Sequence, residues 1–146
     1  MKNRFVSSVL ASSLLVVLSV ALGYAGSTAR FNVTVPFAFT AGNVAYPSGD
    51  YRISQTLNGF LEIQNMQGNR TSLFSTRPGG SSGQYANPSI QFHRYTDQYF
   101  LFKVSSGFGV ESLELPVSRL EKDFIGAART VANNSLQPEV FVVASR

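Results

Sequence analysis

Large apolar residues occupy every second position of residues 31–39, with polar or small residues between them. Because successive side chains of a β-strand point to opposite faces, this period of two predicts a half-buried strand. Pro36 lies on the polar side of the pattern. Proline has no N–H to donate to a neighbouring strand, so its position predicts an edge strand or a bulge.

Turn-forming residues divide the next part of the chain into short segments. Residues 41–43 and 47–50 are rich in Gly, Asn, Pro and Asp, and each group predicts a chain reversal. Further turns at residues 57–59 and 67–69 separate three strands, which together predict a meander that ends at residue 76.

The loop at residues 57–59 determines the register of its hairpin. Gly59 can adopt the left-handed conformation that closes a three-residue loop with a bulge. This loop places Ile53 opposite Ile63, whereas a two-residue Asn-Gly turn would place Ile53 opposite the polar Gln64. We therefore expect the three-residue loop.

The most aromatic hairpin of the chain follows a stretch, residues 77–87, that is rich in glycine and serine and that we expect to be a flexible loop. We expect the hairpin to be joined by a three-residue loop at residues 96–98. With that loop one face carries Ile90, Phe92, Phe100, Phe102 and Val104. The opposite face then carries Gln91, His93, Tyr95, Tyr99, Leu101 and Lys103.

One helix is predicted among the strands, over residues 119–131, because apolar residues recur there at intervals of three and four. Ser118 and Glu121 have the spacing of a capping box. In this motif the serine hydroxyl accepts the amide of Glu121, and the carboxylate accepts the amide of Ser118. Asn133 and Asn134 tolerate the left-handed conformation in which helices end, and Pro138 prevents the helix from continuing.

These elements predict a single antiparallel β domain of six to eight strands, either a sandwich or a small barrel. The helix is expected to lie against this sheet structure. The final strand, residues 140–144, is continuously apolar, which is typical of a strand buried on both faces. Twelve Phe, six Tyr and only 14% charged residues exclude a disordered chain.

The start of the chain has the pattern of an export signal. Lys2 and Arg4 precede an apolar stretch over residues 5–21, and Gly23 and Ala25 are small enough for the cleft of a signal peptidase. A retained membrane anchor is the alternative, but the stretch is shorter than the roughly 20 residues that span a bilayer.

We therefore expect a signal peptide at residues 1–25, followed by one β-rich domain at residues 26–146. The mature protein is expected in the periplasm or outside the cell. Its membrane contact is expected only through the signal peptide, before cleavage.

The composition also bears on chemistry. The absence of Cys excludes disulfides, thiolate metal sites, a catalytic thiol and the lipid-modified Cys of bacterial lipoproteins. The net charge of +4 comes from basic residues that are scattered singly, so we do not expect nucleic acid as a partner.

His93 is the only histidine, which leaves too few ligands for a zinc site. A hydrolase that uses His93 with Asp97 is one function to consider. However, the chain has no Gly-x-Ser-x-Gly elbow to present a nucleophile. We expect no catalytic residue, no metal and no cofactor, and hence no enzyme.

Aromatic residues outside the predicted core need an explanation; Tyr85, Tyr95, Tyr99 and Phe108 are the examples. Three roles are open for them: they line a ligand cavity, they complete a second core, or they form a surface for a partner. We expect a binding face made by His93, Tyr95, Tyr99 and Lys103. The expected function is an exported module that binds an envelope or extracellular macromolecule, and the alternative is a carrier of a small apolar ligand inside a β-barrel.

Three strings carry a resemblance to a known group of proteins: VPFAFTAGNVAYPSGDYRI, ANPSIQFHRYTDQYFLFKV and ELPVSRLEKD. In this order they resemble a group of small secreted proteins common in acidobacterial genomes. Members of the group read roughly VPF-x-F, P-x-G-x-Y, HRY-x-x-QYFL and ELP-x-SR. The similarity covers residues 31–123, and it implies a secreted, β-rich fold without implying a reaction.

Overall fold

A computed structural model describes residues 29–56, 59–68, 70–81, 87–107, 111–132 and 137–145. The expected signal peptide, residues 1–25, lies outside the described residues. The strands are β1 (Ala29–Val35), β2 (Phe39–Ala41), β3 (Val44–Tyr46), β4 (Gly49–Gln55), β5 (Phe60–Asn65), β6 (Thr71–Ser75), β7 (Arg77–Ser81), β8 (Ser89–Tyr95), β9 (Gln98–Ser105), β10 (Glu111–Glu114) and β11 (Glu139–Ala144). Helix α2 (Arg119–Ala132) precedes the last strand. The mainly β fold is confirmed, and the described residues form eleven short strands where six to eight were expected.

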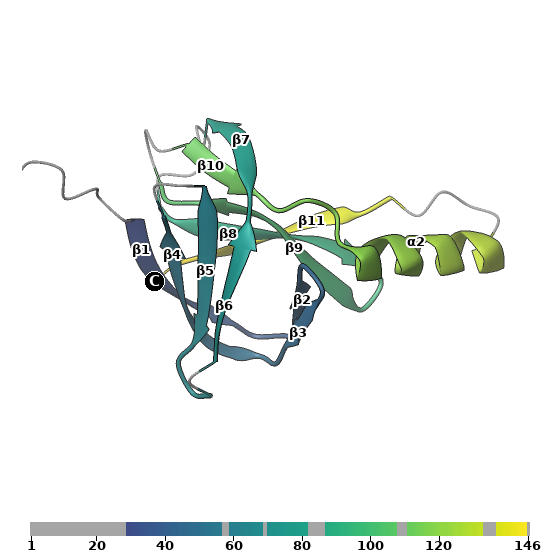
Figure 1. The fold of residues 1–146 in the computed structure, drawn as a ribbon. Coiled ribbons are helices and arrows are strands. Elements are labelled where there is room, and N and C mark those ends of the chain that lie inside the picture. The colour runs from purple at the N-terminus through teal and green to yellow at the C-terminus, as the bar shows by residue number, and fades with distance from the viewer. Residues whose placement is uncertain are drawn as a thin grey trace, which may run out of the picture.

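The strands form two sheets that pack against one another (Figure 1). Sheet A has the order β1-β4-β5-β6, and sheet B has the order β11-β8-β9-β10-β7. In sheet B, β2 also pairs with β9 in parallel, and β3 pairs with β2. The other pairings of the described strands are antiparallel, as expected for strands joined by short turns.

Pro36 marks the place where the chain leaves sheet A. The predicted strand over residues 31–39 is two strands, because β1 ends at Val35 and β2 begins at Phe39 in the other sheet. Val35 and Phe39 are both buried, so the alternation of apolar side chains continues across the break. The edge position predicted from Pro36 is confirmed, since β1 forms one edge of sheet A.

The predicted meander is confirmed by β4, β5 and β6. Ile53 lies opposite Ile63, which is the register that the three-residue loop requires. Gly59 has φ +72°, the left-handed conformation that favours glycine. The other two loop residues, Leu57 and Asn58, lie outside the described residues.

The flexible loop expected at residues 77–87 is wrong for its first part. Residues 77–81 form β7, which pairs with β10 at the edge of sheet B, while residues 82–86 lie outside the described residues. A β-carbon on Gly79 would lie 2.7 Å from Cγ of Glu114, so the side chains of β10 leave no room for one here. Pairing of this kind uses backbone groups, and glycines leave no side-chain periodicity by which a sequence pattern could reveal it.

The turn between β8 and β9 is shorter than expected. Tyr95 lies opposite Gln98, so the turn has two central residues, Thr96 and Asp97, and not three. Thr96 has φ +56°, a conformation that β-branched residues rarely adopt. The β-branched Thr96 therefore gave no indication of a two-residue turn in the sequence.

This change moves several aromatic side chains to the other face of sheet B. Phe100 lies opposite His93, and Phe102 stacks on His93, so both belong to the outer face that is turned away from sheet A. A register shift between Gln91 and Phe92 then returns Val104 to the core. The predicted common face of Phe92, Phe100 and Phe102 is wrong.

The core lies between the two sheets and contains large side chains from both. Its buried members are Val33, Val35, Phe39, Ala41, Tyr46, Tyr51, Ile53, Leu61, Ile63, Ile90, Phe92, Leu101, Val104 and Leu115. Phe92 is fully buried and meets Phe37 and Phe39 edge to face at 5.2 and 5.3 Å between ring centroids. Such aromatic contacts stabilise a core beyond the burial of their area.

The last strand re-enters the sheet as predicted, but its burial differs. β11 pairs with β8 and forms an edge of sheet B. Phe141 and Val143 pack against the core, whereas Val140 is 53% exposed. Burial on both faces is therefore wrong, because the alternate apolar residues of β11 lie on the outer face.

Helix α2 begins where the sequence predicts. The amide of Glu121 donates to Oγ of Ser118 at 3.1 Å, which confirms the serine cap. Oδ1 of Asn43, in the β2–β3 turn, accepts from the amides of Arg119 and Leu120. The carboxylate of Glu121 turns to sheet B, so the second half of the capping box is wrong. The asparagines expected at the helix exit, residues 133 and 134, lie outside the described residues.

Only the first turns of α2 contact sheet B, and the rest of the helix extends away from both sheets (Figure 1). The helix that was expected against the sheet structure does contact it, but only at the N-terminal end. Among the described residues, none of the helical segments is long and apolar enough to span a membrane.

The serine cap leads to a testable expectation. Replacement of Ser118 by Ala should lower the free energy of unfolding by about 1 kcal/mol, because the amide of Glu121 loses its acceptor. Ser118→Asp should be nearly neutral, because a carboxylate also accepts this amide. Thermal melts of both variants measure the difference, and equal losses of stability would contradict the cap.

Candidate functional site

Three polar side chains meet on the outer face of sheet B, where α2 reaches the sheet. Nδ1 of His93 lies 2.7 Å from Oε1 of Glu121, and the hydroxyl of Tyr95 donates to the same oxygen at 3.0 Å. Glu121 is 3% exposed although it is an ionisable residue. Two donors to one buried carboxylate offset the cost of removing it from water. We call these residues, His93, Tyr95 and Glu121, the polar clamp.

Aromatic rings surround the polar clamp. The ring of His93 stacks on Phe102 with 3.9 Å between centroids. Phe124 of α2 packs near both Tyr95 and Phe100, at 6.0 and 6.1 Å between centroids. The first two turns of the helix are therefore held by hydrogen bonds and by ring contacts together.

The environment of the clamp raises the pKa of the Tyr95 phenol from 10 to about 12. Desolvation is the largest cause, followed by the charge of Glu121 and the hydrogen bond to it. All three disfavour a phenolate beside a carboxylate in a buried place. The neutral phenol is therefore the form that the fold requires.

This shift predicts how stability changes in alkaline solution. A pKa that is raised in the folded state contributes stability below pH 10, and this contribution is lost as the pH rises to about 12. Wild type should lose more stability across this range than Tyr95→Phe, which has no phenol to ionise. Thermal melts of both proteins between pH 9 and pH 12 test this, and parallel losses would contradict it.

The other two predicted binding residues have different partners. Tyr99 points to the core side, where it stacks on Phe37 at 3.9 Å between centroids and meets Phe141 at 5.8 Å. Nζ of Lys103 donates to the carbonyl of Gly79 at 2.7 Å and to Glu114 at 3.2 Å. The structure thus brings His93 and Tyr95 together and places Tyr99 on the opposite face of sheet B. Lys103 lies opposite Gln91, on the face of His93, but its amine is bound by Gly79 and Glu114. All four residues have intramolecular contacts.

Exposed apolar side chains border the polar clamp. Val117 and Leu120, at the start of α2, are 42% and 46% exposed. Val140 of β11 is 53% exposed and lies opposite His93 in the sheet, so both side chains are on the outer face. We call Val117, Leu120 and Val140 the α2 rim.

Sequence patterns missed both Glu121 and the rim. Glu121 was assigned to the helix cap, and its partners on β8 are 26 and 28 residues away. The apolar period of the helix includes Val117 and Leu120, but the period does not say that they stay uncovered. Tyr85 and Phe108, two of the surplus aromatics, lie outside the described residues.

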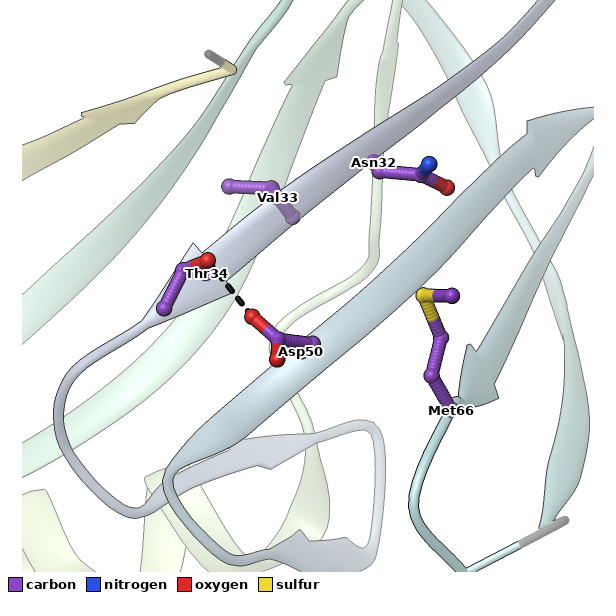
Figure 2. Close-up of a pocket in the computed structure, with 5 residues that line it drawn as sticks. All are labelled: Asn32, Val33, Thr34, Asp50 and Met66. Atoms are coloured by element: carbon purple, nitrogen blue, oxygen red, sulfur yellow. Dashed lines mark hydrogen bonds between the residues drawn. The ribbon is translucent and has the colours of Figure 1, made fainter.

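Two hollows lie elsewhere on the surface, on either side of β1. One has a volume of about 270 Å³ and is lined by Asn32, Val33, Thr34, Asp50 and Met66 (Figure 2). The other has a volume of about 350 Å³ and is lined by Thr34, Pro36 and residues 141–144 of β11. Figure 2 shows the hydroxyl of Thr34 donating to Oδ1 of Asp50, at 2.6 Å.

The contacts of His93 bear on the hydrolase considered from the sequence. The partner of His93 is Glu121, which holds a helix, and not the Asp97 of the considered hydrolase. Within the described ranges no three His, Cys, Asp or Glu residues form a group that could hold a metal ion. The arrangement fixes a helix on a sheet and presents apolar side chains beside it.

Comparisons with known proteins add no relative. The chain matches no family model, and no curated protein or solved structure that was compared with it is significantly similar. Its function has to be inferred from its own contacts and surfaces.

Proposed function

We propose that this protein is an exported, non-enzymatic module that binds an envelope or extracellular protein through the α2 rim. The rim is the observation that carries the proposal. Val117, Leu120 and Val140 are large apolar side chains that stay in water around a helix start that the polar clamp holds in place. The pattern of the first 25 residues supports export.

Burial of this rim by a partner would be favourable. Full burial of an exposed Val or Leu side chain contributes about 1.5–3 kcal/mol, and each rim side chain has about half of its surface left to bury. The polar clamp and the cap from Asn43 also hold the helix start before any partner arrives. A surface that is already ordered loses less conformational entropy on binding, so more of the burial energy remains as affinity.

A carrier of a small apolar ligand is the second function considered, and the interior gives it less support. The space between the sheets is occupied by buried side chains such as Tyr51, Phe92 and Ile63. The two hollows described above lie at the surface. Binding at an outer surface is therefore the function that the geometry favours.

Affinity capture tests the proposal. The mature domain is immobilised and exposed to envelope and culture-medium extracts of the organism that encodes it, and the retained proteins are quantified by mass spectrometry. Wild type should retain specific partners, and Leu120→Gln with Val140→Gln should reduce their recovery about tenfold or more. Both substitutions replace exposed side chains, so the variant is expected to stay folded.

Leu73→Gln is the matched control, because Leu73 is 60% exposed but lies on β6 of sheet A. This variant should retain the partners as well as wild type does. Equal recovery of every protein by wild type and the double variant would exclude the α2 rim as the binding surface.

A further inference from the structure

Strand β1 has one unpaired backbone edge, and β11 of the other sheet packs close to part of this strand. Strand β1 pairs with β4 on one side, and none of the described strands pairs with it on the other. Because alternate N–H and C=O groups of an edge strand point outwards, β1 offers a row of donors and acceptors over Ala29–Val35. This edge is separate from the α2 rim, and pairing at the edge does not depend on the rim.

The two surface hollows lie on opposite sides of this strand. Side chains of Asn32 and Thr34 reach the hollow that Asp50 and Met66 complete on the outer face of sheet A (Figure 2). The second hollow lies between β1 and β11, and Phe141 is part of its apolar lining. Thr34 belongs to both, so the hollows meet at the end of β1.

The two hollows differ in chemistry. The first contains a carboxylate: Asp50 accepts the Thr34 hydroxyl through Oδ1, and a carboxylate has a second oxygen that can accept further donors. The second is lined mainly by apolar residues, with Pro36 on one side and residues 141–144 on the other. Side chains of an added strand alternate between two faces, so neighbouring residues would meet a negative and an apolar environment in turn.

We propose that the free edge of β1 accepts an extended peptide segment of a partner protein, with a basic side chain over Thr34 and apolar side chains toward β11. Backbone hydrogen bonds to β1 supply affinity in such strand addition, and the hollows select alternate side chains. The basic residue is complementary to Asp50.

The edges of β6 and β7 fit such a segment less well. β7 contains Pro78 and two glycines, and its register with β10 is irregular. A proline lacks an N–H, and an irregular register interrupts the row of donors and acceptors. β6 exposes Leu73, but neither of the two hollows lies beside it.

Synthetic peptides test the proposal directly. The first probe is an eight-residue peptide that alternates valine and threonine and carries one lysine in place of a central threonine. The second has glutamate at that place, and the third is the lysine peptide with alternate backbone amides methylated. Fluorescence anisotropy should show that the mature domain binds the lysine peptide most tightly. Methylation should abolish binding, because it removes the donors that face β1.

Two charge variants locate the binding site. Asp50→Asn should weaken binding of the lysine peptide about fivefold and leave that of the glutamate peptide no weaker. Glu62→Gln is the matched control, because it removes one negative charge from β5 of the same sheet and should change nothing. The α2 rim variant should also bind the lysine peptide normally, so the peptide result is independent of the rim experiment.

Three results would overturn the proposal. One is no binding of the lysine peptide at about 1 mM, a concentration at which even weak strand addition is measurable. Another is equal binding of the methylated peptide, which would mean that no backbone pairing occurs. The third is equal weakening by Asp50→Asn and Glu62→Gln, which would place the lysine away from Asp50.

Discussion

Replacement of Glu121 by Ala should lower the free energy of unfolding by about 3 kcal/mol, one of the largest effects expected for a single substitution in this protein. Glu121 is 3% exposed, and its Oε1 accepts hydrogen bonds from both His93 and Tyr95. Without the carboxylate, two donors lose their shared acceptor at a largely buried place. The start of α2 also loses its main polar contact with sheet B.

Four further variants separate the causes. Glu121→Gln keeps the shape and one acceptor oxygen, so it should cost about 1–2 kcal/mol. Asp123→Ala is the control on the same helix, because Asp123 is exposed and makes only a long surface ion pair, 3.9 Å between its Oδ2 and Nε of Arg119. Its loss should lower the free energy of unfolding by at most about 0.5 kcal/mol. His93→Ala is measured alone and together with Glu121→Ala, and the double variant should lose less stability than the sum of the two single changes.

Urea denaturation of the mature domain measures all of these changes. Far-ultraviolet circular dichroism in the native baseline shows whether α2 remains helical in the Glu121→Ala protein. If Glu121→Ala proved no more harmful than Asp123→Ala, the polar clamp would not hold the helix.

Local patterns predicted the parts of the fold in which neighbouring residues interact. The register of Ile53 with Ile63 follows from one loop length, and the Ser118 cap follows from a spacing of three residues. In both cases the interacting residues are close to one another in the sequence. Pro36 also indicated an irregularity near the end of β1, since a proline cannot continue the pairing of a central strand.

Features that depend on distant residues were not predictable in this way. β7 is a strand because β10 lies beside it, and its glycines carry no pattern. Asn43 caps α2 from 76 residues away, and Glu121 finds its partners on β8. For the site, the pattern identified His93 and Tyr95 as a pair on one face, but not the acid between them. Because Glu121 belongs to α2, the side chains of His93 and Tyr95 bind the helix and are not directed at a ligand.

The sharpest test of the β8–β9 register compares two phenylalanines that the sequence pattern placed on one face. Phe92→Ala should lower the free energy of unfolding by about 4 kcal/mol, because Phe92 is fully buried and meets Phe37, Phe39 and Tyr99. Phe102→Ala should cost only about 1–2 kcal/mol. Its ring is half-buried on the outer face, where it stacks on His93.

The difference between these two costs depends on the two-residue turn at Thr96 and Asp97 and on the register shift after Gln91. With a three-residue turn and regular pairing, both rings would enter the core and both substitutions would be equally harmful. Urea denaturation of the two variants distinguishes these arrangements. Phe60→Ala is the reference for an exposed ring, because Phe60 is 38% exposed on β5 and should cost about 1 kcal/mol or less. A cost for Phe102→Ala near that of Phe92→Ala would refute the observed register, and with it the placement of His93 beside α2.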